Sequence, residues 1–169
     1  RVNVFILNQA TIDLVSSLLM ILFGINIDVS AFTGPLGVFL CLFWAPGSDP
    51  LLFCCFAIST YNLTVMSVER YIAVLHPVQY RRIFKRSVCI GIMVLTWLLA
   101  PLAEYMFPIL KNGVIAGECT IKPTWTPKVA AIVGTFLFHW EFVIPCVVMS
   151  FAYLRIIKTL RDTALSVHP

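Results

Sequence analysis

Charged side chains inside long apolar segments are the first candidates for chemistry in this chain. Asp13 lies near the middle of one apolar stretch, and Glu104 and Glu141 lie within two later ones. A charge at the centre of a bilayer costs roughly 3 kcal/mol or more, so an intramembrane carboxylate normally faces a partner or a cavity. We therefore expect Asp13 to face the interior of a helix bundle as a functional or hydrogen-bonded carboxylate.

Glu104 and Glu141 fall nearer the outer ends of their segments, and His139 precedes Glu141 by two residues. These three side chains predict a polar cluster that opens to the outside, which would be a candidate ligand pocket. The alternative is a pair of carboxyl groups that are hydrogen-bonded within the bundle or exposed at the interface. An enzyme is not indicated, because no nucleophile–base spacing or metal-ligand motif accompanies these acids.

The elements that must position these residues are transmembrane helices. The chain is 60% hydrophobic and 12% charged, with a mean hydropathy of +0.93, which lies outside the range of ordinary soluble domains. A helix needs about 20 apolar residues to cross a hydrocarbon core of roughly 30 Å. Four segments meet this length, at about residues 4–27, 50–75, 88–110 and 129–157. The predicted fold class is an all-α, polytopic membrane helix bundle.

The distribution of positive charge predicts how these segments are oriented and excludes nucleic acid as a partner. Cytoplasmic loops of membrane proteins collect Lys and Arg. Of the 12 basic residues, nine fall on one side: Arg1, Arg70, Arg81, Arg82, Lys85, Arg86, Arg155, Lys158 and Arg161. We therefore expect residues 75–87 and the C-terminal end in the cytoplasm, and residues 28–49 and 111–128 outside.

Two cysteines are expected to form a disulfide on the oxidising, outer side. Cys41 and Cys119 lie outside the apolar spans, whereas Cys54, Cys55, Cys89 and Cys146 lie inside them. The chain begins without Met and runs directly into an apolar segment, which suggests an internal piece of a longer protein. The pattern Asn62-Leu63-Thr64 matches a glycosylation acceptor, but it lies deep in a span and is expected to be a false positive.

Several motifs together resemble those of rhodopsin-like (class A) G-protein-coupled receptors, from the second to the fifth transmembrane helix. Asp13 follows Asn8 by five residues, as in the second helix, and Trp97 stands where the fourth helix has its characteristic Trp. The motifs of the third and fifth helices are Glu69-Arg70-Tyr71 with Pro77, and Pro145 with Tyr153 eight residues later. The resemblance implies four helices of a seven-helix receptor in the plasma membrane.

The resemblance also implies roles for these residues. Asp13 and Ser59 would match the sodium-binding and polar-network positions of the family, and Asn8 would reach Trp97 across the second, third and fourth helices. A sodium ion at Asp13 is then the one ion to consider, and no other cofactor is expected. Pro145 lacks a backbone N–H, so it should create a local irregularity in the fifth helix.

On the cytoplasmic side, the resemblance implies a switch. Arg70 would be restrained by Glu69 at rest and released toward Tyr153 and a heterotrimeric G protein on activation. An Arg held by a carboxylate at a membrane edge is a two-state ion pair whose partner can be exchanged. Tyr71 and Pro77 would complete this motif.

The chain departs from the family pattern at several positions. The usual third-helix Cys falls on Ala45, four residues after Cys41, and the Asp that binds amines in amine receptors falls on Leu52. Gln9 begins the run Gln9-Ala10-Thr11-Ile12, where Leu-Ala is more usual. The absence of the amine anchor slightly favours a small peptide as the extracellular ligand.

Two other classes of protein were weighed against a receptor. A four-span membrane adaptor gives no reason for the spacing of these motifs. A transporter, whose path Asp13, Glu104 and Glu141 would line, should show internal symmetry or helices broken at mid-membrane, and the sequence shows neither. The function expected from the sequence is therefore ligand sensing and G-protein activation.

Overall fold

The computed structural model describes residues 2–24, 34–44, 50–115, 118–121 and 126–167. It describes the backbone alone for residues 2–3, 23–24, 36, 40, 42–44, 106–115, 118–121 and 166–167. The long helices are α1 (Val2–Gly24), α3 (Pro50–Leu75), α5 (Arg86–Lys111) and a continuous rod made of α6 (Pro127–Phe138), the π-helical segment η1 (His139–Val143) and α7 (Ile144–Val167). Four helical stretches in this part of the chain are long and apolar enough to cross a membrane. The predicted all-α membrane bundle is confirmed.

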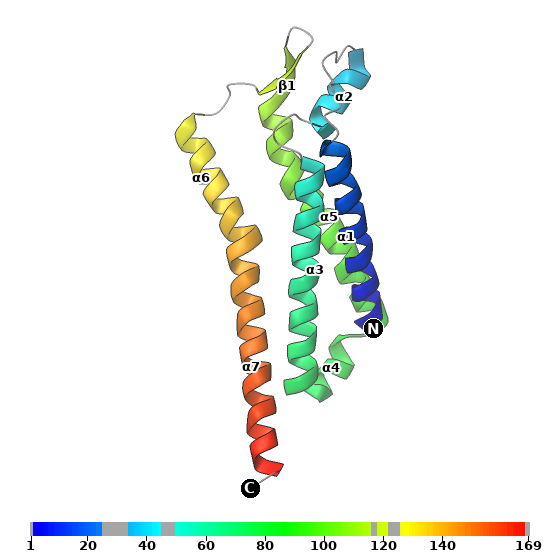
Figure 1. Ribbon diagram of the computed structural model, residues 1–169, viewed down its shortest axis with the longest axis vertical. Coiled ribbons are helices and arrows are strands. Elements are labelled where there is room, and N and C mark those ends of the chain that lie inside the picture. Colours follow the sequence, from blue (N-terminus) through cyan, green and yellow to red (C-terminus); the bar gives the residue numbers. More distant parts are fainter. Residues whose placement is uncertain (1, 25–33, 45–49, 116–117, 122–125, 168–169) are drawn as a thin grey trace.

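The short elements lie at the two ends of the bundle (Figure 1). Helix α2 (Gly34–Trp44) and the hairpin of β1 (Asn112–Ile115) and β2 (Glu118–Ile121) share one end, and α4 (Pro77–Ile83) lies at the other. Residues 36–44 do not extend α3 outward but belong to the separate helix α2. Pro77 occupies the first turn of α4, where its missing N–H costs no hydrogen bond.

The segment after Leu110 contains two strands that the all-α prediction did not include. The chain forms an antiparallel hairpin in which Asn112 pairs with Ile121 and Val114 pairs with Cys119. The turn-forming Asn112-Gly113 and Gly117 dominated the sequence pattern. The β-branched residues Val114, Ile115, Thr120 and Ile121 supply the strand preference that the sequence analysis underweighted.

Helix α3 is the central element of the bundle. It contacts α7, α1 and α5 (Figure 1), and its small residues Cys54, Cys55 and Ala57 are buried against Ile12 of α1 and Ala100 of α5. Small side chains let helix backbones approach closely in membranes. A second cluster nearer α4 buries Phe5, Phe84 and Cys89. These contacts place the polar residues of α3 between the neighbouring helices.

The structure describes the side chain of only one of the two cysteines in the expected disulfide. Cys41 of α2 is fully buried and disulfide-bonded, whereas Cys54, Cys55 and Cys146 in the spans are free thiols. Helix α2 contacts β1, which is paired to the strand that carries Cys119. The side chain of Cys119 lies outside the described residues, so the Cys41–Cys119 pairing stays a prediction.

We expect peptide mapping under non-reducing conditions to recover Cys41 linked to Cys119. The bond would close a loop of about 80 residues and stabilise the fold by about 2–4 kcal/mol. Replacing either cysteine by Ser should therefore lower the unfolding temperature by a similar amount in both single variants. The matched control is Cys146→Ser, which alters a thiol inside a span. Recovery of both outer cysteines as free thiols would contradict the pairing.

Candidate functional site

Asn62 is the centre of a polar network between α1, α3 and α5. Its side chain is 2% exposed. Its amide nitrogen donates to the backbone oxygen of Phe5 at 3.1 Å and to Oε1 of Gln9 at 2.8 Å, and its Oδ1 accepts from Asn8 at 3.1 Å. A buried amide without partners would be costly in a membrane interior. Here both ends of the Asn62 amide are satisfied, so the network ties α1 to α3.

Asn8 extends this network to α5. Its Oδ1 accepts a hydrogen bond from the indole Nε1 of Trp97 at 3.0 Å. The contact that the resemblance implied between these two residues is therefore present. Because Trp97 and Asn8 are 89 residues apart in sequence, this bond fixes the relative positions of two helices that are distant along the chain.

Gln9 extends the network in the other direction, to Asp13. Its Nε2 donates to Oδ1 of Asp13 at 2.9 Å and approaches Oγ of Ser59 at 2.5 Å. The Ser59 hydroxyl is 3.4 Å from the same carboxylate oxygen. Asp13 thus lies near Ser59, as expected, and Gln9 bridges the two, although the side chain of Asp13 is exposed in the described part of the chain.

The sodium ion that the resemblance implies can be tested against this arrangement. A cation needs oxygen lone pairs, but Oδ1 of Asp13 faces an amide N–H and a hydroxyl. The amide oxygen of Gln9 already accepts from Asn62. In the described part of the chain, no group of three or more His, Cys, Asp or Glu side chains could hold a metal ion. Both groups that face Oδ1 of Asp13 are therefore hydrogen-bond donors, and the sodium ion stays a prediction.

The cytoplasmic end of α3 carries the Glu69-Arg70-Tyr71 triplet. Glu69 is 2% exposed, and its Oε1 accepts a hydrogen bond from the hydroxyl of Tyr80 in α4 at 2.9 Å. The expected restraint of Arg70 by Glu69 is not present, because Arg70 is exposed and forms no ion pair with any described residue. The physical reason is that adjacent residues on a helix point in different directions, and Tyr80 fills the space that faces Glu69.

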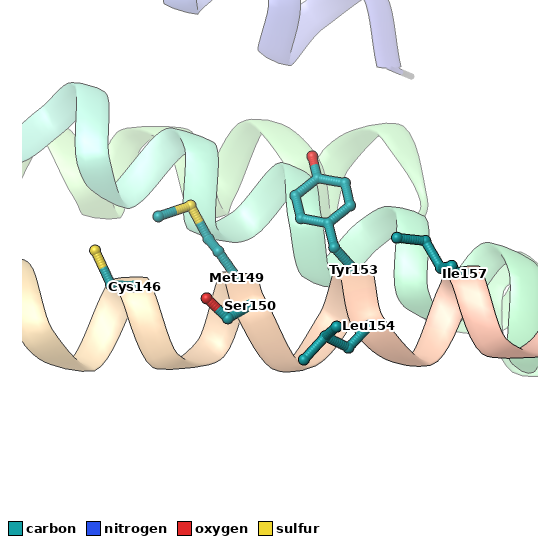
Figure 2. A pocket seen from close by; sticks show the side chains of 6 residues that line it. All are labelled: Cys146, Met149, Ser150, Tyr153, Leu154 and Ile157. Atoms are coloured by element: carbon teal, nitrogen blue, oxygen red, sulfur yellow. The ribbon is translucent and has the colours of Figure 1, made fainter.

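Tyr71 connects this end of α3 to α7. Its ring lies 5.9 Å from the ring of Phe151, and Phe151 also lies under the guanidinium of Arg155 at 5.7 Å. Tyr153 lies on α7 in an open groove of 440 Å³ that is mostly apolar. Figure 2 shows its ring projecting from α7 on the same side as Met149. No hydrogen bond joins Tyr153 to Arg70 within the described chain.

The outer cluster is only partly assembled. The carboxyl groups of Glu104 and Glu141 lie near enough to influence each other electrostatically, with Tyr61 of α3 beside them. One oxygen of each carboxyl, Oε1, is buried without a donor among the described residues. His139 does not join them, because it is exposed and its Nδ1 lies 2.7 Å from the backbone oxygen of Thr135 on its own helix. Of the three residues of the predicted ligand pocket, only Glu104 and Glu141 therefore lie together.

The backbone around Glu141 is a π-helix, and Pro145 accounts for its position. The segment His139–Val143 widens by one residue, and the N–H of Ile144 bonds back five residues to His139. Pro145 follows immediately and has no N–H with which to continue the regular pattern. The local irregularity expected from Pro145 is thus observed. Such π-segments within helices occur frequently at functional sites.

Three residues of these networks were missed by sequence reasoning. Asn62 was seen only as part of a false glycosylation pattern, and Tyr80 was given no role. Gln9 was noted as a departure from the family pattern without a role. A polar amide within an apolar span was the available signal, because an amide in hydrocarbon needs a partner just as a carboxylate does.

The comparisons with known proteins agree with this geometry. The family description "7 transmembrane receptor (rhodopsin family)" matches residues 1–168. The chain is 29% identical to the "Dopamine D2-like receptor" of Drosophila melanogaster over 96% of its length and 29% identical to the "Alpha-1D adrenergic receptor" of Mus musculus over 97%. It is also 31% identical to the "Melanin-concentrating hormone receptor 1" of Sus scrofa over 62% of its length.

This chain belongs to the rhodopsin family of seven-transmembrane receptors. The family consists of multi-pass membrane receptors, and four helical stretches of the described chain are long and apolar enough to cross a membrane. It spans 17% of the length of the Drosophila receptor, 28% of the mouse receptor and 31% of the pig receptor.

Asn62→Leu should destabilise the helix bundle by about 2 kcal/mol. It removes the three hydrogen bonds that Asn62 makes to α1, with Phe5, Gln9 and Asn8, and bonds between membrane helices contribute about 0.6 kcal/mol each. Trp97→Phe removes one bond to Asn8 and should cost about a third as much. The measurement is the free energy of unfolding in lipid or detergent.

Thr60→Ala is the control for this series, because its hydroxyl bonds only to Phe56 on its own helix. We expect its free energy of unfolding to stay within about 0.5 kcal/mol of the parent. Equal stability of Asn62→Leu and Thr60→Ala would show that the network does not hold the helices together.

Proposed function

We propose that the receptor senses an extracellular ligand and activates a heterotrimeric G protein through Arg70. The observation that carries this proposal is the arrangement at the cytoplasmic end of α3. Glu69 is buried and bonded to Tyr80, while the neighbouring Arg70 is exposed and has no ion-pair partner among the described residues. A guanidinium in this state is available to a protein that docks at the membrane surface.

The Tyr80 contact supports a modified form of the expected switch. Arg70 is kept available because Tyr80, and not Arg70, satisfies the carboxylate of Glu69. Loss of the Tyr80 hydroxyl would leave a buried carboxylate, and the strongest alternative donor nearby in sequence is Arg70. Helix α4 therefore regulates the switch by deciding which partner Glu69 has. Tyr71, whose ring contacts that of Phe151 of α7 in a tilted arrangement, couples the same end of α3 to the fifth helix of the family.

Two carboxyl groups support a ligand with a basic group. The buried Oε1 atoms of Glu104 and Glu141 have no donor among the described residues, and an ionised carboxylate can only accept. A cationic side chain or terminus entering from outside would supply the missing donors. Since Leu52 stands where amine receptors carry their Asp, a small peptide with a basic residue fits better than a monoamine.

We expect Arg70→Ala to abolish basal G-protein activation, measured as nucleotide exchange in membranes that contain the receptor. This readout needs no known ligand. Arg70→Lys keeps the charge but loses the planar fork of donors, so it should retain only a small part of the activity. Tyr80→Phe should lower activation severalfold, because Glu69 would then compete for Arg70.

Lys128→Ala is the matched control, since it removes an exposed cation on the opposite side of the membrane. Surface expression of all variants should be measured in parallel. Undiminished exchange in Arg70→Ala at normal expression would contradict the proposed role. Undiminished exchange in Tyr80→Phe alone would contradict only the regulation by α4.

For the ligand, we expect Glu141→Gln and Glu104→Gln to weaken the response to an activating basic peptide by tenfold or more, because each loses a charge-assisted hydrogen bond of about 1.5–3 kcal/mol. A panel of basic peptides and dopamine would be screened first, with G-protein activation as the readout. Dopamine should not activate. The control is Asp162→Asn, an exposed carboxylate near the end of α7. Activation by dopamine that survives both Gln substitutions would contradict the peptide assignment.

A further inference from the structure

The hydrogen bonds that end at Asp13 all run in one direction. The indole N–H of Trp97 donates to the oxygen of Asn8, and the amide N–H of Asn8 donates to the oxygen of Asn62. The amide N–H of Asn62 donates to the oxygen of Gln9, and the amide N–H of Gln9 donates to the carboxylate of Asp13. Hydrogen bonds arranged head to tail polarise and strengthen one another.

The direction of this series of hydrogen bonds is set by groups that can only donate or can only accept. Trp97 can only donate, so the amide of Asn8 must present its oxygen to Trp97 and its nitrogen to Asn62. The backbone carbonyl of Phe5 can only accept, and it lies 3.1 Å from Nδ2 of Asn62. Both constraints give Asn62 the same orientation, with its nitrogen toward Gln9.

Gln9 consequently cannot turn its oxygen toward Asp13. A reversed amide would place the two N–H groups of Gln9 against those of Asn62 and leave two oxygens facing each other at the other end. With its orientation determined in this way, Gln9 presents a hydrogen atom to Oδ1 of Asp13 at a nitrogen–oxygen distance of 2.9 Å. Ser59 lies 3.4 Å from the same oxygen.

We propose that Gln9 is a built-in neutral donor that takes the place of a cation at Asp13, so that this receptor does not depend on sodium. The carboxylate is stabilised by an amide of the adjacent helical turn and not by an exchangeable ion. Leu, the residue more usual at this position in the family pattern, has no hydrogen-bond donor and would leave Oδ1 of Asp13 without the donor that Gln9 supplies. Gln9 is thus a positioning residue. Its own orientation is set by the hydrogen bonds that begin at Trp97.

The test compares thermal unfolding of the receptor in lipid nanodiscs at equal concentrations of sodium chloride and potassium chloride. The wild-type receptor should unfold at the same temperature in both salts. Gln9→Met keeps the length of the side chain without the donor and should unfold about 3–6 °C lower in potassium. Sodium should restore part of this loss, and Gln9→Leu should behave in the same way.

Two controls separate the effect from general destabilisation. Thr11→Ala alters a hydroxyl that bonds only to the Leu7 carbonyl of its own helix and should show no difference between the salts. Asp13→Asn in the Gln9→Met background should abolish the sodium effect.

The wild-type comparison needs no substitution, so it remains decisive even if a variant fails to fold. Stabilisation of the wild-type receptor by sodium over potassium would overturn the proposal. A Gln9→Met variant that folds and unfolds equally in both salts would also overturn it. Because no measurement depends on a ligand or a G protein, the result is independent of the proposed signalling function.

Discussion

The rest of the structure depends on the satisfaction of one buried amide. Asn62 lies on the central helix, in surroundings where water cannot replace a missing partner. Its partners come from α1 directly and from α5 through Asn8 and Trp97. The polar contacts thus act at the same place as the small residues of α3, which allow the helices to approach closely. Packing brings the helices together, and the amide determines their rotation about their axes.

Buried carboxyl groups need hydrogen-bond donors on both sides of the bundle, and the two sides differ in whether donors are present. At the cytoplasmic end, the buried carboxylate of Glu69 has a partner in Tyr80, and this leaves Arg70 exposed. Toward the outer side, Glu104 of α5 and Glu141 of η1 have buried oxygens without donors among the described residues. In the proposed function, the unsatisfied carboxyl groups would take the ligand, which acts by binding one state of the receptor better than the other.

Much of the helical architecture could be predicted because hydropathy is a local property. The span expected at residues 50–75 coincides with Pro50–Leu75, and the irregularity before Pro145 follows from the missing N–H of one residue. The hairpin was missed because its strands are only four residues each, too short for a periodic signal next to strong turn residues. His139 was misplaced in the outer cluster because neighbours on a helix do not share a face.

The sequence by itself determined the solvent, the number of spans and which polar residues need partners, because each of these follows from the cost of placing a residue in hydrocarbon. Only the tertiary structure decided which residues are the hydrogen-bond partners. Asn62 meets Asn8 across 54 positions, and Trp97 meets Asn8 across 89. These contacts depend on how each helix is rotated about its axis, and many other contacts together set that rotation. The direction of the hydrogen-bond chain to Asp13 depends further on the carbonyl of Phe5, and no residue type in the sequence reveals where a backbone oxygen points.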